Sequence, residues 1–246
     1  RKESSAASDV YKRQEVCPLE TKYPQGGERS LIYAVTGRSV NSSMLPADAG
    51  CIVDNVDTVC AIYMAVCKNT PLMRRIVTVT GDAIANPKNF SVLLGTNYQE
   101  VIDAAGGFKQ DPEKVISGGP MMGMAQASAD FPVAKGTGAV LAFAANENKV
   151  SEDPTCIRCG RCVEACPMHL EPLYLYLYVQ KNRIEDLEAA HVMDCIECGA
   201  CTYTCPARLP LTHAFRLGKQ EVNNARMAAK AKAEAEAKAA AEKKEA

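Results

Sequence analysis

Two copies of one cysteine motif constrain the fold of this chain more than any other feature. Each copy reads C-x2-C-x2-C-x3-C-P, with a glycine after the second cysteine. Cysteines at this spacing ligate cubane iron–sulfur clusters, because a tight loop can turn three sulfurs inward. The motifs contain Cys156, Cys159, Cys162 and Cys166, then Cys195, Cys198, Cys201 and Cys205. Eight thiolates suffice for two [4Fe–4S] clusters.

The fourth cysteine of each copy is expected to serve a different cluster from the first three. It follows on the next helical turn, where it cannot easily reach the same iron cube, and the proline after it redirects the chain. In two-cluster ferredoxins such a cysteine ligates the other cluster. We therefore assign the first cluster to Cys156, Cys159, Cys162 and Cys205, and the second to Cys195, Cys198, Cys201 and Cys166.

Two other uses of these cysteines fit the pattern less well. Structural zinc takes four thiolates as two spaced pairs, a smaller set than the one found here. Disulfides need an oxidising compartment, usually in a short secreted chain, and we expect no signal peptide here. The pattern therefore favours a reducing compartment such as the cytoplasm.

Length, net charge and the distribution of apolar residues limit the kinds of molecule that the chain can be expected to bind. The chain has 246 residues, enough for two small domains or one large one. Its net charge is −1, so no surface for nucleic acid is expected. No apolar run reaches the roughly 18 residues that a membrane-spanning helix needs. We expect a protein that is soluble or peripheral to a membrane.

The N-terminal part of the chain divides into a tail and a segment of βα character. Residues 1–14 are polar and aperiodic, and we interpret them as a non-native or disordered tail. Within residues 15–70, the run at 30–35 fits either a buried strand or the end of a helix. Residues 54–68 are predicted to form a helix, because apolar side chains recur at spacings of three and four.

In residues 71–147 the apolar residues recur at the spacing that is typical of β-strands. Their β-branched and apolar runs predict four strands, and Thr96 with Gln99 forms the pattern of a capping box that opens a helix. The expected strands cover 75–80, 90–94, 114–117 and 139–144, and the expected helix covers 97–105. This order suits a small α+β domain of the β-grasp type.

Residues 148–222 hold both cysteine motifs in a helical setting. The stretch 171–190 alternates like a strand in its first half, but its apolar residues also recur at helical spacing, and we predict one helix. A second helix is expected over 211–222. Residues 223–246 are mostly Ala, Lys and Glu, which predicts a solvated helix or a disordered tail.

Four short stretches precede the cysteine motifs in a specific order. They are KYPQGGE at 22–28, LPADAG at 45–50, TVTG at 78–81 and SGGPMMG at 117–123. With the two motifs, they make residues 15–221 resemble the C subunit of the Rnf (also called Rsx) ion-translocating electron transport complex, of which this chain would be a C-terminal fragment. The resemblance implies an α+β multidomain protein: the remnant of a flavin domain of the complex I type, an SLBB-like β-grasp domain and a helical, ferredoxin-like dicluster domain.

The resemblance also implies where FMN would bind. The flavin subunit of complex I carries a Y-x-x-G-x-E turn and an N-N-V-E-T helix start, matched here at 23–28 and 54–58, with an Asp at position 54. Glu28, Asn55 and Thr58 are therefore the predicted FMN contacts, and a helix N-terminus favours the phosphate. The alternative is that Asn55 only caps the helix and that Glu28 is a surface charge. No G-x-G-x-x-G-type segment precedes these residues, so we expect the NADH-binding loops in the full-length parent.

By this resemblance the chain is an electron-transfer subunit of a membrane-associated, ion-translocating NADH:ferredoxin oxidoreductase. Its clusters would relay single electrons between FMN and NADH in the full-length parent and a ferredoxin-like partner subunit, with no catalytic side chain. The expected location is peripheral, on the cytoplasmic side of the bacterial inner membrane, among the other subunits of the complex. Two alternatives stay open: an iron–sulfur subunit of a quinone- or heterodisulfide-linked oxidoreductase, and a non-redox binding module with structural clusters.

Overall fold

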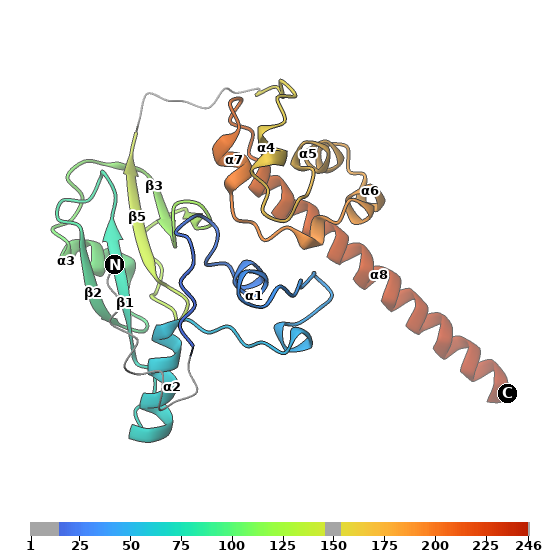
Figure 1. Cartoon of the computed structure of the whole chain (residues 1–246), viewed down its shortest axis with the longest axis horizontal. Coiled ribbons are helices and arrows are strands. Elements are labelled where there is room, and N and C mark those ends of the chain that lie inside the picture. The colour runs from blue at the N-terminus through green and yellow to red at the C-terminus, as the bar shows by residue number, and fades with distance from the viewer. Residues whose placement is uncertain (1–14, 146–153, 246) are drawn as a thin grey trace. The chain divides into compact units, whose positions relative to one another are not determined.

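The computed structural model of the chain describes residues 15–145 and 154–245 (Figure 1). The tail expected at 1–14 lies outside the described residues, so the structure does not test that prediction. The chain forms two compact units, and the boundary between them falls between Val53 and Asp54. The β-rich segment and both cysteine motifs therefore belong to the second unit.

The first unit is built around one short helix. This helix, α1, covers Glu28–Thr36 and ends at Gly37, whose φ of 70° is left-handed. The run at 30–35, which fitted either a strand or a helix end, is thus helical. A single turn of 3-10 helix, η1, follows at Pro46–Ala49. The small core of the unit consists of Ile32, Val40 and Ala49.

The second unit begins with α2, Val56–Lys68, which confirms the helix expected over 54–68. Asn55 caps this helix, because its side-chain Oδ1 accepts a hydrogen bond from the backbone N–H of Asp57 at 2.9 Å. The Asp57 carboxylate also pairs with Arg75 Nη1 at 2.9 Å. The first turn of α2 is thereby tied to the strand that follows it.

A five-stranded mixed sheet forms the next part of the second unit. Its elements are β1 Arg74–Thr80, β2 Lys88–Leu93, α3 Tyr98–Ala104, β3 Pro112–Ser117, β4 Met124–Gln126 and β5 Ala139–Ala144. The strand order is β2-β1-β5-β3-β4; β1 and β5 are parallel, and the other neighbours are antiparallel. The four expected strands are confirmed, and β4 is an addition to them. The sheet with its single helix is the expected small α+β domain.

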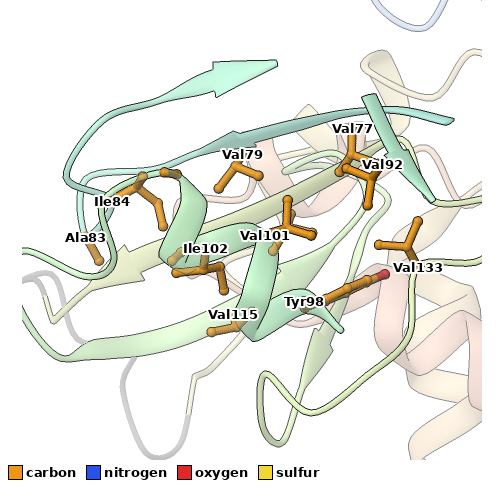
Figure 2. Close-up of a cluster of buried hydrophobic side chains, with 13 residues drawn as sticks. Val77, Val79, Ala83, Ile84, Val92, Tyr98, Val101, Ile102, Val115 and Val133 are labelled. Carbon is orange, nitrogen blue, oxygen red and sulfur yellow. The ribbon is translucent and has the colours of Figure 1, made fainter. Parts of the chain in front are cut away.

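One face of this sheet is covered by α3. Figure 2 shows Tyr98, Val101 and Ile102 of the helix pointing toward side chains of the strands. Val77 and Val79 of β1 are fully buried in this core. The alternation of buried and exposed residues along β1 follows from the period of two in a strand, which presents one side chain in two to the helix.

The start of α3 differs from the expected capping box. The capping residue is Asn97, whose side-chain Oδ1 accepts a hydrogen bond from the N–H of Gln99 at 2.9 Å. Thr96 instead precedes the cap, so its predicted role is wrong. Asn is at least as good a helix cap as Thr, and here it occupies the position from which its side chain reaches the free amides.

Helices dominate the part of the second unit that holds the cysteine motifs. They are α4 Arg161–Glu164, α5 Pro172–Gln180, α6 Ile184–Ala189, the 3-10 turn η2 Val192–Asp194, α7 Ala200–Thr204 and α8 Leu211–Glu245. The single helix expected over 171–190 is wrong, because the chain breaks at Asn182, whose φ is 49°. The helix expected over 211–222 continues to residue 245, so the Ala/Lys/Glu segment is helical.

A second hydrophobic core packs beneath the cysteine loops. The first three turns of α8 supply side chains at helical spacing, and α5 and α6 contact that face. The fully buried members of this core include Leu175, Leu187, Val192, Leu211, Phe215 and Val222. The cysteine loops are therefore mounted on a packed helical base.

Candidate iron–sulfur centres

The first cysteine loop turns a backbone amide toward the sulfur of Cys156. Arg158 has a left-handed backbone with a φ of 56°, and its N–H donates to Cys156 Sγ at 3.4 Å. Gly160, with a φ of 79°, then opens the short helix α4. Amide hydrogen bonds to a ligating sulfur are among the contacts that set the potential of an iron–sulfur cluster.

The second loop repeats this conformation position by position. Glu197 has a φ of 56°, and its N–H donates to Cys195 Sγ at 3.4 Å. Gly199, with a φ of 80°, opens α7. His169 and Arg208, with φ of 54° and 55°, each follow the fourth cysteine of their motif at the same spacing. The sequence repeat is therefore also a repeat of the backbone.

Two cavities gather the eight thiols, and each cavity draws on both motifs. The larger, about 410 Å³, is lined by Cys156, Cys159, Cys162 and Cys205. The smaller, about 20 Å³, is lined by Cys166, Cys195, Cys198 and Cys201. Each cavity thus combines three thiols of one motif with the fourth thiol of the other.

The chemistry of this donor set fits [4Fe–4S] clusters, which four cysteine thiolates hold. Within residues 15–145 and 154–245, no three His, Cys, Asp or Glu side chains converge on a point suited to a single metal ion. The thiols stand instead along the walls of the two cavities.

Burial distinguishes the second loop from the first. Cys198 and Cys201 are only 7% and 8% exposed, whereas Cys159 is exposed. Burial raises the pKa of the Cys201 thiol to about 12, and the neighbouring Cys195 and Cys198 add to this rise. Burial also raises the pKa of Cys195 and Cys198. These thiols are protonated at neutral pH, so ligation of a metal must displace their protons.

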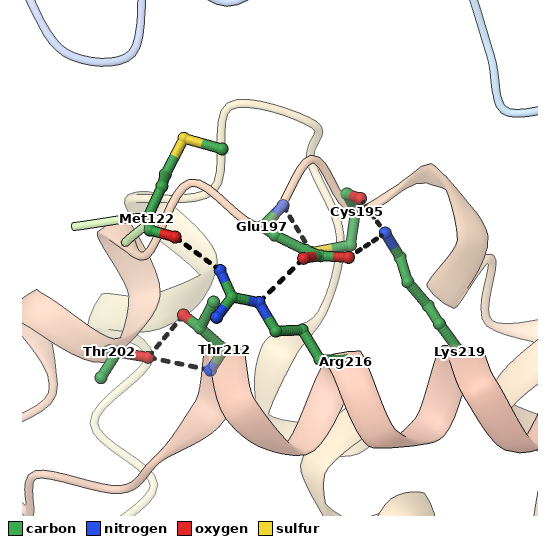
Figure 3. A network of polar contacts seen from close by, with 7 residues as sticks. All are labelled: Met122, Cys195, Glu197, Thr202, Thr212, Arg216 and Lys219. Carbon is green, nitrogen blue, oxygen red and sulfur yellow. Dashed lines mark hydrogen bonds and ion pairs between the residues drawn. The ribbon is translucent and has the colours of Figure 1, made fainter. Parts of the chain in front are cut away.

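A network of charged side chains braces the second loop (Figure 3). The Glu197 carboxylate accepts hydrogen bonds from Arg216 Nε at 2.9 Å and Lys219 Nζ at 2.8 Å. Lys219 Nζ also donates to the carbonyl oxygen of Cys195 at 2.6 Å. Burial disfavours the charged form of Glu197, but the hydrogen bonds from Lys219 and Arg216 outweigh it and lower the pKa of Glu197.

The sequence predictions did not include this network. One signal was available, because Glu197 stands where the first motif has Arg158, so an otherwise repeated loop carries opposite charges. The partners on α8 gave no comparable signal. Arg216 and Lys219 lie in a segment without a recognised motif, and only the packing of α8 brings them to the loop.

The predicted FMN contacts are distributed over both units. Glu28 is the first residue of α1 in the first unit and is exposed. Asn55 caps α2 in the second unit, and Thr58 lies in the first turn of that helix. The side chain of Asn55 makes the capping bond that the alternative interpretation expects. An FMN contact stays a prediction for all three residues.

Three family models match the chain in consecutive segments. The Nuo51 FMN-binding domain matches residues 1–64, the SLBB domain matches residues 76–125, and the 4Fe-4S dicluster domain matches residues 155–209. The last segment contains all eight motif cysteines. Along the chain the matches thus run from an FMN-binding domain through an SLBB domain to a dicluster domain.

Relatives from several bacteria extend these matches. The C subunit of the Na+-translocating ferredoxin:NAD+ oxidoreductase complex of Acetobacterium woodii is 50% identical over 210 residues, which is 85% of this chain and 47% of the relative. The C subunit of the proton-translocating complex of Clostridium ljungdahlii is 48% identical over 219 residues, 89% of this chain and 48% of the relative. The C subunit of the ion-translocating oxidoreductase complex of Rhodobacter capsulatus is 42% identical over 205 residues, 83% of this chain and 40% of the relative.

The fold, the two thiol-lined cavities and the family matches define a multidomain iron–sulfur protein with an SLBB domain and a two-cluster [4Fe–4S] domain. The three relatives named above are C subunits of ion-translocating complexes, and each is 42–50% identical to this chain over the aligned residues. The chain is therefore similar to the C subunits of ion-translocating oxidoreductase complexes over the residues that align with them. It spans about half the length of the curated relatives it matches.

Proposed function

We propose that this chain relays single electrons through two [4Fe–4S] clusters as part of a membrane-associated, ion-translocating ferredoxin:NAD+ oxidoreductase. The observation that carries the proposal is the pair of cavities, each lined by thiols of both cysteine motifs. The reaction is taken from the relatives, two of which are named as subunits of ion-translocating ferredoxin:NAD+ oxidoreductases.

The proposal assigns four ligands to each cluster. The first cluster takes Cys156, Cys159, Cys162 and Cys205, and the second takes Cys195, Cys198, Cys201 and Cys166. The lining of the two cavities supports this crossed assignment, since each contains one of these two sets. The amide contacts to Cys156 and Cys195 support a ligand role for the first cysteine of each loop.

A [4Fe–4S] cluster accepts and returns one electron, which would link the two-electron chemistry of a flavin to one-electron partners. The residues of this chain hold, space and shield such clusters. Cys201 lies in α7 and Cys205 directly follows it, and the two thiols line different cavities, so this short helix holds the two sites close together. Leu175 and Phe215, both fully buried, line the smaller cavity with apolar surface. No side chain is assigned a role as acid or base.

The flavin side and the location complete the proposal. FMN and NADH would bind in the full-length protein, with Glu28, Asn55 and Thr58 contributing to the FMN site, and electrons would pass to a ferredoxin-like partner subunit. No helix in the described part of the chain combines the length and the apolar character needed to cross a bilayer. We place the protein at the cytoplasmic side of the membrane, bound to the other subunits of the complex.

The family matches favour this function over its two alternatives. An iron–sulfur subunit of a quinone- or heterodisulfide-linked enzyme would account for the dicluster segment alone. The FMN-binding and SLBB matches upstream support an enzyme that also handles flavin. A non-redox binding module would hold clusters that cannot be reduced reversibly, and this is open to measurement.

The first test is the metal content of protein purified without oxygen. We expect about eight iron and eight acid-labile sulfide per chain, with EPR signals of reduced clusters after dithionite. Zinc in place of iron, or iron that dithionite does not reduce, would contradict the proposal.

A ligand variant tests the assignment itself. Cys198→Ala should lose one cluster, about half of the iron, because that cluster then lacks one of its four thiolate ligands. The matched control is Cys60→Ala, which removes an exposed thiol of α2 outside both motifs and should leave the iron content unchanged. Full iron content in Cys198→Ala would refute the ligand scheme.

A further inference from the structure

The two cysteine loops share a backbone conformation but differ in their electrostatic surroundings. At the equivalent position the first loop carries Arg158, which is exposed, and the second carries Glu197, which is only 28% exposed. Arg158 is one of the residues that line the larger cavity. The side chain of Glu197 turns back to α8, where two cations hold it.

The second loop is fixed by charge at short distances. Lys219 is 18% exposed, and its ammonium contacts both the Glu197 carboxylate at 2.8 Å and the Cys195 carbonyl at 2.6 Å. Arg216 holds the other carboxylate oxygen at 2.9 Å. The negative charge of Glu197 and the positive charges of Arg216 and Lys219 sum to one positive charge, which lies beside the thiols of the smaller cavity. Because this site is largely withdrawn from water, that charge is screened less than a surface charge would be.

The same arginine connects the loop to the β-rich domain. Arg216 Nη2 donates to the carbonyl oxygen of Met122 at 2.8 Å, as Figure 3 shows. The backbones also meet, since a Cβ added at Gly199 would lie 2.7 Å from the Met121 carbonyl oxygen. Met121 and Met122 belong to the SGGPMMG stretch that follows β3. The second loop is thus held on two sides.

We infer that Lys219, Glu197 and Arg216 position the second cysteine loop and set the reduction potential of the cluster it holds, independently of the first cluster. This inference rests on the proposed function, since it needs reducible clusters in both cavities. Reduction adds a negative charge to a cluster. A nearby cation favours the reduced form and raises the potential, and a nearby anion lowers it.

The test is an EPR-monitored redox titration of the purified protein and its charge variants. Lys219→Gln and Arg216→Gln should lower the midpoint potential of the second cluster, and Glu197→Gln should raise it. The second cluster is identified as the reduction step that Cys198→Ala removes. Arg226→Gln is the matched control. Arg226 lies on α8, like Arg216 and Lys219, but it pairs with Glu188 of α6, and neither residue lines one of the two cavities. This variant should leave both midpoint potentials unchanged.

The sign of the shifts separates an electrostatic role from a merely structural one. Shifts of opposite sign for Lys219→Gln and Glu197→Gln, confined to the second step, support the inference. Shifts in the same direction, equal shifts in both steps, or no shift would overturn it. If Lys219→Gln fails to assemble its second cluster, Glu197→Gln decides alone, and a lowered or unchanged potential in that variant refutes the inference. Wild-type protein without two reducible clusters would refute the proposed function instead.

Discussion

Gly81 stands at the end of β1 in a position where no side chain fits. Its φ is 123°, and a Cβ built there would lie 2.0 Å from the carbonyl oxygen of Ala142. Ala142 belongs to β5, which pairs with β1 at the centre of the sheet. Neither backbone can move away without disturbing this pairing. The glycine of the TVTG stretch is therefore a packing requirement of the sheet.

Replacing this glycine should be costly for stability. Gly81→Ala combines an unfavourable backbone conformation with a clash against backbone, and we expect a loss of at least about 2 kcal/mol in the free energy of unfolding. Urea unfolding monitored by circular dichroism measures this loss. Gly136→Ala is the control, because an added Cβ there meets nothing within 4 Å. Equal stability of the two variants would show that the sheet adapts.

Cys201 predicts a pH dependence for protein stripped of iron and kept reduced. Folding raises the pKa of this thiol from 9.0 to about 12, so the folded state favours the protonated form. The stability this contributes is fully present below pH 9.0 and is lost as the pH rises toward 12. We expect the urea midpoint to fall as the pH rises from about 9 to about 10.5, and to fall less in Cys201→Ala. An equal fall in both proteins would contradict this.

At this scale the sequence revealed the cysteines but not the side chains that support them. The spacing of each motif is local, so the expected ligands could be read without knowing the fold. The contacts of Glu197 with Arg216 and Lys219 depend on how α8 packs against the loop. No local pattern encodes that packing, and only the change of charge between the two motifs pointed to it.

Among the elements, α3 is joined to the sheet by a buried hydroxyl. Tyr98 is 3% exposed, and its hydroxyl shares hydrogen bonds with Ser117 Oγ at 2.7 Å and Thr137 Oγ1 at 3.1 Å. Ser117 ends β3, and Thr137 lies just before β5. One side chain thus fixes the helix to two neighbouring strands.

Removing this hydroxyl should weaken the domain without changing its shape. Tyr98→Phe removes the hydrogen bonds to Ser117 and Thr137, although Thr137 Oγ1 still accepts one from the N–H of Ala134 at 3.0 Å. We expect a loss of about 1–2 kcal/mol in the free energy of unfolding. Tyr203→Phe is the matched control, since Tyr203 is 80% exposed. Thermal or urea unfolding of both variants measures the difference. Unchanged stability in Tyr98→Phe would mean that water replaces the lost bonds.

Elements with a clear period could be predicted, and the exceptions have physical causes. Apolar spacing located α2 and the four long strands within a few residues. Spacing could not show the break at Asn182, because α5 and α6 bury the same kind of residue on either side of it. The length of α8 follows from Ala, Lys and Glu, which favour helix even where no apolar face is buried. A pair such as Lys230 and Glu234, 3.9 Å apart, adds a small contribution.

At the scale of the whole molecule, the second unit contains two separate cores. One core belongs to the sheet and α3, and the other lies beneath the cysteine loops. The second core is small, and several cysteines pack against it. Small domains of this kind depend on bound metal for much of their stability.

Iron removal should therefore affect the two cores differently. After chelation we expect residues 154–222 to stay folded but to lose part of their protection from hydrogen exchange, whereas β1, β5 and α3 keep theirs. Mass spectrometry of peptides from the two regions, before and after treatment with chelator, measures this. The sheet serves as the internal control. A uniform loss of protection would show that the two cores unfold as one unit.

The mixed lining of the two cavities has a consequence for the timing of assembly. A protein chain leaves the ribosome from its N-terminus, so the first motif emerges well before the second. At that moment only Cys156, Cys159 and Cys162 of the larger site have been synthesised, and its fourth thiol, that of Cys205, is still missing. For the smaller site only Cys166 has been synthesised, and the thiols of Cys195, Cys198 and Cys201 are still missing. Neither site can be completed until nearly all of the helical domain exists, and the two are then completed almost together.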